Sequence, residues 1–331
     1  MVRHCIKKRH RCFVYWLTSK FQMKNVLIIG NGFDLDLQMQ TRFSNFASNP
    51  DYWPSDKSRL CAFLESQKDI DRWFDLEACL LEYISSESTY CPSTNCTFEI
   101  EQDKDYFDKL CQSLTSYINN EQVHIKIPNE SIAKKVLKAI VENGYYQSIY
   151  SFNYTDLKYL ANRMGITFNL EYKHLHGSIK ERNIILGVND RDIRKEYLKF
   201  RKANSSTYCS NDLSRSLMRA HEIVFFGLSF GNIDFCYFKE FFNSLSNDAN
   251  RSERSKKWLT IFTKDEKSRL EIINNFESEG IMMSKLASFS NINFIYTHED
   301  NDKKNLEEFF ARQSTNSKAE ISRNCLDALR F

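Results

Sequence analysis

Short apolar runs recur along the chain and predict the strands of a sheet. The run from Val26 to Ile29 is apolar at every position, which is typical of a strand buried on both faces. Further runs predict strands at 147–152, 168–174, 183–188, 222–228, 258–262 and 291–296. They alternate with helical patterns, one of them at about 265–278. This alternation predicts an α/β fold with a doubly wound, mainly parallel sheet.

Helical spacing with many charges replaces the apolar runs at about 58–140. We interpret this part as a helical insertion in the sheet domain, with polar loops at 85–105 and 119–130. The basic, polar stretch at 190–219 predicts a mobile loop, and 312–331 is predicted to be a polar C-terminal tail.

The composition is that of a globular protein. Of 331 residues, 42% are hydrophobic and 27% are charged, which is too apolar for wholesale disorder. No apolar run approaches the roughly 18 residues that span a bilayer, so we expect no membrane partner. The ten cysteines contain no Cys-x-x-Cys pair. Together with the missing export signal, this pattern predicts reduced thiols and a cytoplasmic protein.

The net charge of +3 conceals an uneven distribution. Residues 1–22 hold six Lys and Arg residues and no acid, so that 40 basic residues face 43 acidic ones in the rest of the chain. A mildly acidic body makes nucleic acid an unexpected partner. We interpret 1–22 as a basic extension upstream of a natural start at Met23, and we expect the α/β domain to span 23–311.

Glycines gather where the predicted strands end. The chain has only nine glycines, and six of them follow or close such a strand: 30, 32, 177, 187, 227 and 231. Open α/β sheets bind ligands at the carboxyl ends of their strands. Glycine at these ends permits a positive φ and lets backbone N–H groups approach a phosphate. The distribution therefore predicts a nucleotide site at this edge.

The first glycine turn carries part of a dinucleotide fingerprint. Gly30-Asn31-Gly32 supplies two of the three glycines, with Leu35 in the third place. This motif alone fits a tight strand-to-helix turn without ligand equally well. Asp34 is suited either to cap the next helix or to bind a ribose hydroxyl, and the sequence leaves both open.

Polar side chains also follow two further strands. Asn153 suits a ribose hydroxyl, a water molecule or a helix cap. His174 and His176 share a face, and His176 before Gly177 is placed to act as a base or to bind a sugar hydroxyl. A buried structural histidine is the alternative. A metal site would need a third ligand such as Asp190, and we rank it last.

The turn after the strand at 222–228 completes the set. In Phe226-Gly227-Leu228-Ser229, the glycine and the serine can hold an adenosine or a phosphate, while Asp234 either joins the site or caps the following helix.

These motifs, in this order, resemble those of the AbiH family of bacterial phage abortive-infection proteins. The matching segments are Ile28–Leu35, Trp73–Glu77, Ser151–Thr155, His174–Gly177, Ile185–Gly187, Phe226–Ser229 and Asp234–Phe238. The chain departs from the family at Leu228, where a His is usual, and at Phe230, where a Leu is usual.

The layout is more distantly similar to the sirtuin-type NAD-binding fold, a Rossmann-type sheet. On that resemblance Asn153 matches the strand-end Asn, His176 the catalytic His, and Gly227 and Ser229 the turn that holds adenosine. Thr155 replaces an Asp of the pattern, and the zinc module of sirtuin deacylases is absent. The resemblance therefore implies NAD glycohydrolysis without a metal, and not deacylation.

We therefore expect an anti-phage effector that binds NAD and hydrolyses it to nicotinamide and ADP-ribose. The expected catalytic residues are Asn153 and His176. The expected NAD-binding residues are Gly30, Asn31, Gly32, Phe33, Asp34, Gly177, Gly227, Ser229 and Asp234. The alternative is a non-catalytic nucleotide-binding or phage-sensing protein that acts through partners. A phage-derived trigger and a second copy of the chain are the other expected partners.

Overall fold

The computed structural model describes residues 24–68, 75–93, 96–189, 193–205, 208, 211–247, 256–299 and 302–314. The predictions for 1–22, for Asp190 and for 315–331 of the tail lie outside the described residues, whereas 312–314 of the predicted tail end a helix.

Six parallel strands form one sheet in the order β3-β2-β1-β4-β5-β6. The strands are β1 (Lys24–Ile29), β2 (Tyr146–Ser151), β3 (Glu171–His174), β4 (Ala220–Phe226), β5 (Lys257–Thr263) and β6 (Ser290–Tyr296). The chain steps outwards from β1 to β3, returns to the other side of β1 and then steps outwards to β6. The order thus reverses between β1 and β4, as in doubly wound, Rossmann-type sheets. The predicted fold class is confirmed.

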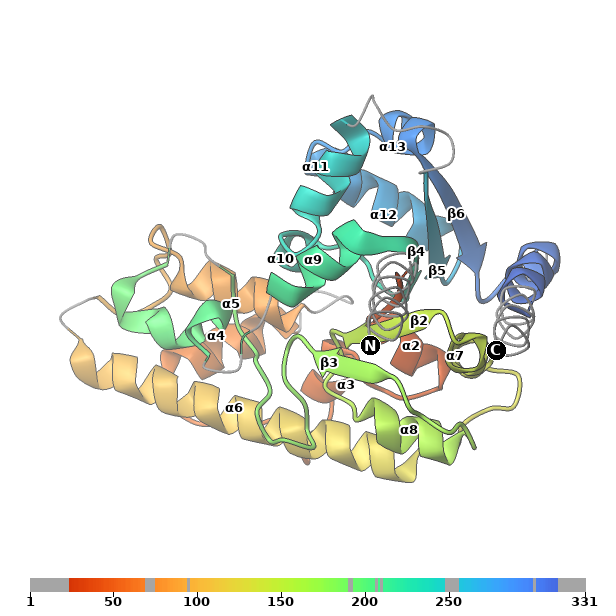
Figure 1. The fold of residues 1–331 in the computed structure, drawn as a ribbon. Coiled ribbons are helices and arrows are strands. Elements are labelled where there is room, and N and C mark those ends of the chain that lie inside the picture. The colour runs from red at the N-terminus through yellow and green to blue at the C-terminus, as the bar shows by residue number, and fades with distance from the viewer. Residues whose placement is uncertain are drawn as a thin grey trace, which may run out of the picture.

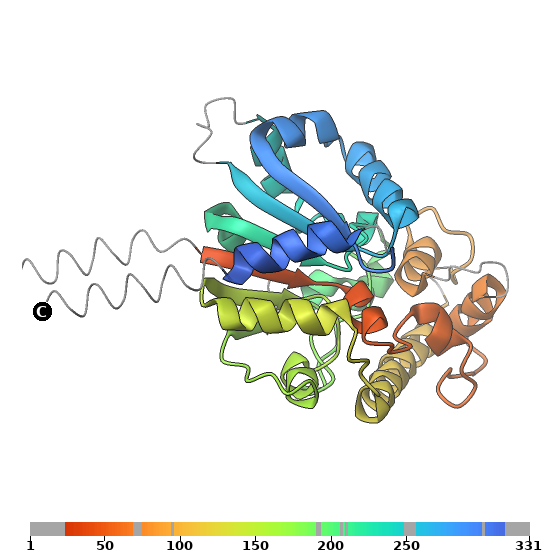
Figure 2. The ribbon, with the colours of Figure 1, turned by 90° about the vertical axis from the view of Figure 1, so that its right-hand side faces the viewer.

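Helices cover both faces of the sheet, and the apolar residues of β1 are buried on both faces. Val26 and Ile28 pack in one apolar cluster and Leu27 and Ile29 in another. The first cluster includes α9 (Asn211–Arg219), α10 (Asn232–Phe235), α11 (Lys239–Asn247), α12 (Glu266–Ser278) and α13 (Met283–Phe289). The second includes α2 (Asn31–Asp36), α7 (Ile132–Asn143), α8 (Leu157–Arg163) and the helix at 303–314. Figures 1 and 2 show the resulting three layers.

The remaining helices have a core of their own beside the sheet, which we term the helical body (Figure 1). They are α3 (Phe43–Ala47), α4 (Arg59–Lys68), α5 (Leu76–Ile84), α6 (Thr97–His124) and the 3₁₀ helix η1 (Lys195–Phe200). Asp103 lies at the centre of this body with no exposed surface. It accepts hydrogen bonds from the hydroxyls of Tyr83 and Tyr197, both at 2.7 Å, and from the N–H of Leu60 at 2.9 Å.

Three sequence predictions about elements are wrong. Much of the predicted loops at 85–105 and 119–130 is helix, because α6 runs unbroken from Thr97 to His124. The segment at 183–188 forms no strand, and only Val188 makes an isolated bridge.

The third concerns the predicted loop at 190–219. Its described parts contain three helices: η1, helix α9 and a second 3₁₀ helix, η2 (Lys202–Asn204).

Within the described part of the chain, no helix is both long and apolar enough to cross a membrane.

Candidate functional site

Two glycine turns meet at the point where the strand order reverses. Ile29 of β1 lies in register with Ser151 of β2 and with Phe226 of β4, so the carboxyl ends of the three strands are level. The ladder continues beyond the strands, since the N–H of Gly30 donates to the Phe226 carbonyl at 2.9 Å. The turns that begin at Gly30 and Gly227 are therefore neighbours at the edge where such sheets bind nucleotides.

The glycines of these turns allow backbone to pack on backbone. A Cβ added at Gly32 would lie 2.5 Å from the Cα of Gly227, and one at Gly30 would lie 2.8 Å from the Gly227 carbonyl oxygen. Gly227 has the expected positive φ of 67°, but Gly30 has a φ of −117°. The N–H of Gly32 donates to the Gly227 carbonyl, and that of Phe33 to the Gly30 carbonyl. The first turn thus needs its glycines for packing, with or without a phosphate.

Two buried polar side chains, Asn153 and Asp34, lie beside the first glycine turn. The Nδ2 of Asn153 donates to the Gly30 carbonyl at 3.1 Å, and the Thr155 hydroxyl donates to the Asp34 carboxylate at 3.1 Å. Burial raises the pKa of Asp34 to about 7, although hydrogen bonds from Asn153 and Thr155 act in the opposite direction. The cap interpretation is wrong for both residues, because Gly30 is the N-cap of α2 and Asp156 that of α8.

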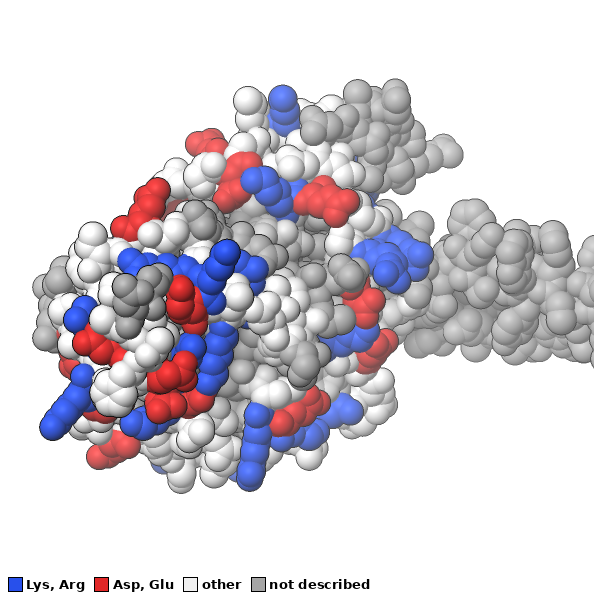
Figure 3. Space-filling view, turned by 90° about the vertical axis from the view of Figure 1, so that its left-hand side faces the viewer, with Lys and Arg blue, Asp and Glu red and all other residues white. Residues whose placement is uncertain are grey.

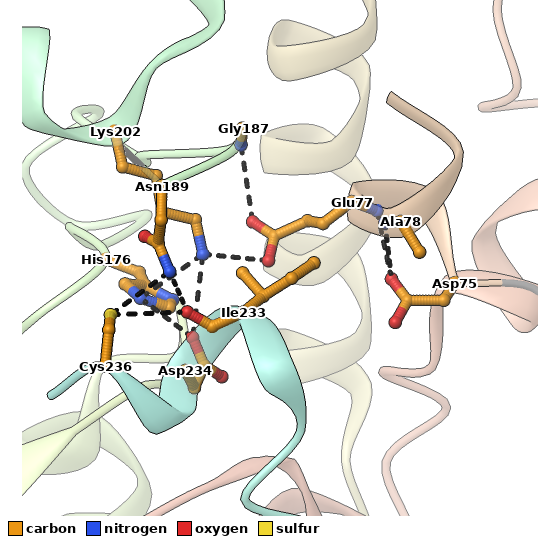
Figure 4. Close-up of polar contacts among 10 residues, drawn as sticks. All are labelled: Asp75, Glu77, Ala78, His176, Gly187, Asn189, Lys202, Ile233, Asp234 and Cys236. Carbon is orange, nitrogen blue, oxygen red and sulfur yellow. Dashed lines mark hydrogen bonds and ion pairs between the residues drawn. The ribbon is translucent and has the colours of Figure 1, made fainter. Parts of the chain in front are cut away.

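Four ionisable side chains gather at the carboxyl edge (Figure 4), and we term them the charge cluster: Glu77, His176, Lys202 and Asp234. The Lys202 ammonium lies 2.8 Å from Glu77 Oε2, 3.4 Å from His176 Nε2 and 3.7 Å from Asp234 Oδ1. His176 Nε2 is 3.5 Å from the same Asp234 oxygen. Lys202 has no exposed side-chain surface, whereas Asp234 keeps 30% of its own. The cluster therefore meets solvent mainly through Asp234.

The surroundings set the protonation of this cluster. Burial and then the Lys202 charge lower the pKa of His176 well below 6.5, so the imidazole is uncharged at neutral pH. Burial disfavours the Lys202 ammonium, but the charges of Glu77 and Asp234 outweigh it and raise the Lys202 pKa. Burial raises the pKa of both carboxyls, opposed by Lys202. A cation thus lies next to a neutral imidazole.

The family model for AbiH, described as bacteriophage abortive infection, matches residues 26–255. The chain belongs to the AbiH family. Membership implies a role in phage abortive infection. The matched segment contains both glycine turns and the whole charge cluster.

Other comparisons add little to this assignment. A search of curated proteins found no match. Among solved structures, one that resembles this AbiH chain is a Sir2 variant with a deacetylated p53 peptide and 3′-O-acetyl ADP ribose. It is 12% identical, the match covers 87% of this chain and 91% of that one, and the TM-score is 0.35. So distant a likeness assigns no ligand.

The remaining predicted residues of this AbiH chain lie around the two turns. Asn31 is exposed and its Oδ1 accepts from the Thr41 hydroxyl, whereas Phe33 is buried against Phe226. Ser229 is exposed and its carbonyl accepts from Asn275.

The segment after β3 and helix α10 hold the others. Gly177 has a φ of 71°, in the left-handed region. The cap interpretation is wrong for Asp234, because Gly231 is the N-cap of α10. His174 ends β3, and its Nδ1 lies 2.9 Å from the Asn153 carbonyl oxygen.

The structure therefore divides the two predicted catalytic residues between two groups of contacts. Asn153 contacts the first glycine turn, whereas His176 contacts Lys202 and Asp234. Phe152 lies between the two groups of contacts. It directly precedes Asn153 in the chain, and its ring packs edge-on against the His176 imidazole with centroids 5.2 Å apart.

Glu77 and Lys202 were missed by sequence reasoning. Glu77 stands in one of the quoted motifs, but nothing local indicates that its Oε1 accepts from the Gly187 N–H. Lys202 lies in a basic stretch, where a buried lysine has no distinguishing pattern. Among the residues that the structure describes, no three His, Cys, Asp or Glu side chains are grouped as metal ligands require.

Proposed function

We propose that this AbiH family member binds NAD at the carboxyl edge between β1 and β4 and hydrolyses the bond between nicotinamide and ribose. One observation carries the proposal: an uncharged imidazole and a partly exposed carboxylate lie together at the edge where doubly wound sheets bind nucleotides. Strongly perturbed ionisable groups at such an edge are typical of active sites.

The dinucleotide would lie across the two glycine turns. Asn31 and Ser229 are exposed on them and can bind the phosphates and the adenosine. The nicotinamide ribose would then point to His176 and Asp234, with Asn153 supporting the first turn through Gly30.

The reaction needs an acceptor for one proton. The ribose C1′–N bond breaks, its electron pair passes to the nicotinamide nitrogen, and positive charge develops on the sugar as in glycosidases. A water oxygen bonds to C1′ and its proton passes to Nε2 of His176, whose imidazole is uncharged at neutral pH and accepts there in the tautomer that carries its hydrogen on Nδ1. The Asp234 carboxylate, 3.5 Å from that nitrogen, stabilises the imidazolium and the sugar cation. Nicotinamide, ADP-ribose and a proton are the products.

The test is nicotinamide release from NAD by the purified full-length chain. His176→Ala should lower turnover by about 100-fold or more, since a positioned base contributes that much. Asn153→Ala should lower it less, because Asn153 acts through the Gly30 turn. His298→Ala changes an exposed histidine beyond β6 and should leave turnover unchanged.

Robust turnover by both His176→Ala and Asn153→Ala would sink the assignment. Thermal stabilisation of the chain by NAD with no product formed would instead support a non-catalytic nucleotide sensor that acts through partners. Circular dichroism of each variant shows whether a loss of turnover reflects the site or the fold.

A further inference from the structure

Burying Lys202 where it lies costs free energy. Its side chain is fully buried and its ammonium lies 2.8 Å from Glu77, whose side chain is 9% exposed. Taking both ions out of water costs free energy that their attraction only partly returns, so two apolar side chains would stabilise such a position as well or better. The pair therefore calls for a reason other than stability.

The position of the ammonium supplies that reason. Glu77 belongs to α5 of the helical body, whereas His176 and Asp234 follow β3 and β4 of the sheet. Lys202 lies between them and is within 4 Å of all three side chains (Figure 4). It is thus the one residue of the cluster that contacts both the carboxylate of the helical body and the polar groups at the sheet edge.

Asp234 depends on this neighbour. Its Oδ1 is buried and forms no hydrogen bond within the described residues, and only the longer contacts to Lys202 and His176 reach it. A buried carboxylate oxygen without hydrogen bonds is stabilised mainly by nearby positive charge. The Lys202 ammonium is the nearest cation among the contacts of this oxygen.

We propose that Lys202 is a positioning residue: its buried ammonium, anchored by Glu77, holds the Asp234 carboxylate beside His176 at the nucleotide edge and disfavours a positive charge on that imidazole. The catalytic part of this role rests on the proposed function. The electrostatic part does not, because a cation 3.4 Å from the imidazole disfavours its protonation whatever the ligand.

The protonation of His176 depends on all the charged and titratable groups around it. They are Lys202 of η2, with Glu77 of α5 and Cys236 near its ammonium, Asp234 of α10, and Tyr237 beyond α10. Among these groups, Lys202 is the only cation and the carboxylates favour the imidazolium. Removing Lys202 should therefore make His176 easier to protonate.

The experiment follows the ring nitrogens of His176 by NMR in the full-length chain, with the signal assigned through His176→Asn. Lys202→Met removes the ammonium and keeps an unbranched side chain of similar reach. The His176 titration should move to higher pH by at least about one unit, as expected for loss of an adjacent charge. Lys257→Met is the matched control, since it removes a buried lysine at the amino edge, bonded to the Met218 carbonyl, and should leave the titration unchanged.

A second variant covers a failure of Lys202→Met to fold. The single change leaves the Glu77 carboxylate buried without its cation, whereas Glu77→Gln combined with Lys202→Met removes both charges and keeps the shape. The double variant should still move the His176 titration to higher pH, but by less than the single variant, because it also removes the Glu77 charge that favours the imidazolium. A titration at the wild-type pH in every folded variant would overturn the proposal.

Turnover separates this inference from the proposed function. If the wild-type chain hydrolyses NAD, the acid limb of its kcat/KM profile should move to higher pH in the double variant, and an unmoved limb would contradict the role of Lys202. If the wild-type chain leaves NAD intact, the proposed function fails, and the NMR titration still decides whether Lys202 sets the protonation of His176.

Discussion

At the scale of single residues, Asp34 couples the first glycine turn to pH. Its carboxyl is 1% exposed, and burial raises its pKa from 3.8 to about 7. An acid whose pKa is higher in the folded state loses stability as the pH rises. The loss begins near pH 4, where the unfolded chain ionises, and is complete above about pH 7.

We predict that Asp34→Asn weakens this pH dependence. The amide oxygen can still accept from Thr155, while the cost of a buried charge at high pH disappears. The gain at pH 8 relative to pH 5 should be about 2.7 kcal/mol, the equivalent of the two pH units between pH 5 and the folded pKa of about 7. Urea unfolding of both proteins at the two pH values measures it. An equal difference at the two values would refute the prediction.

Gly32 tests the packing of the two turns. Gly32→Ala should lower the free energy of unfolding by about 1–3 kcal/mol, since overpacking costs that much and the added Cβ meets the Gly227 Cα. Gly231→Ala is the matched control: its φ is −63° and its added Cβ would meet only Ser229 Oγ at 3.6 Å. Chemical denaturation should show a change within about 0.5 kcal/mol for the control. Equal losses would contradict the packing account.

The sequence predicts where the glycines and polar residues of this edge lie, but not what each of them does there. The glycines mark the carboxyl edge correctly, but their use at 30 and 32 depends on the close approach of Gly227, which is almost 200 residues away in sequence. In the same way, Asp34, Asn153 and Asp234 each follow a strand as a helix cap would. Only the fold shows that Gly30, Asp156 and Gly231 are the caps.

At the scale of elements, the helical body depends on Asp103. Asp103→Ala should lower the free energy of unfolding by about 2–5 kcal/mol, because it leaves two buried hydroxyls and one buried N–H without an acceptor. Asp105→Ala, on the exposed side of the same helix, should change it by less than about 0.5 kcal/mol. Similar losses in the two variants would argue against a central role for Asp103.

Helix α6 shows why the sequence predicts loops at 85–105 and 119–130 where much of the chain is helical. Its polar ends suggested loops, yet Ile100, Tyr106, Leu110 and Leu114 recur at helical spacing and are buried. The opposite error was made at 183–188, where apolar residues pack on the helical body without joining the sheet. An apolar run indicates burial but does not say in which element, so tertiary packing decided both cases.

At the scale of the whole molecule, five of the six strands lie within about two residues of their predicted ends, and β3 starts three residues late. Their order was beyond the sequence, since pairing depends on contacts between distant segments. The order matters for function, because it places the reversal, and hence the two glycine turns, between β1 and β4.

Charges of both signs are mixed on one face of the molecule. On the face in Figure 3, Lys and Arg are interspersed with Asp and Glu. In the helical body, Lys109 pairs with Asp56 and Lys199 with Asp108.

The most direct measurement is a structure of the full-length chain with ADP-ribose bound. We expect the ligand to lie across the turns at Gly30 and Gly227, with its ribose at hydrogen-bond distance from His176 or Asp234. Binding of ADP-ribose away from this edge, or no binding at saturating concentration, would contradict it.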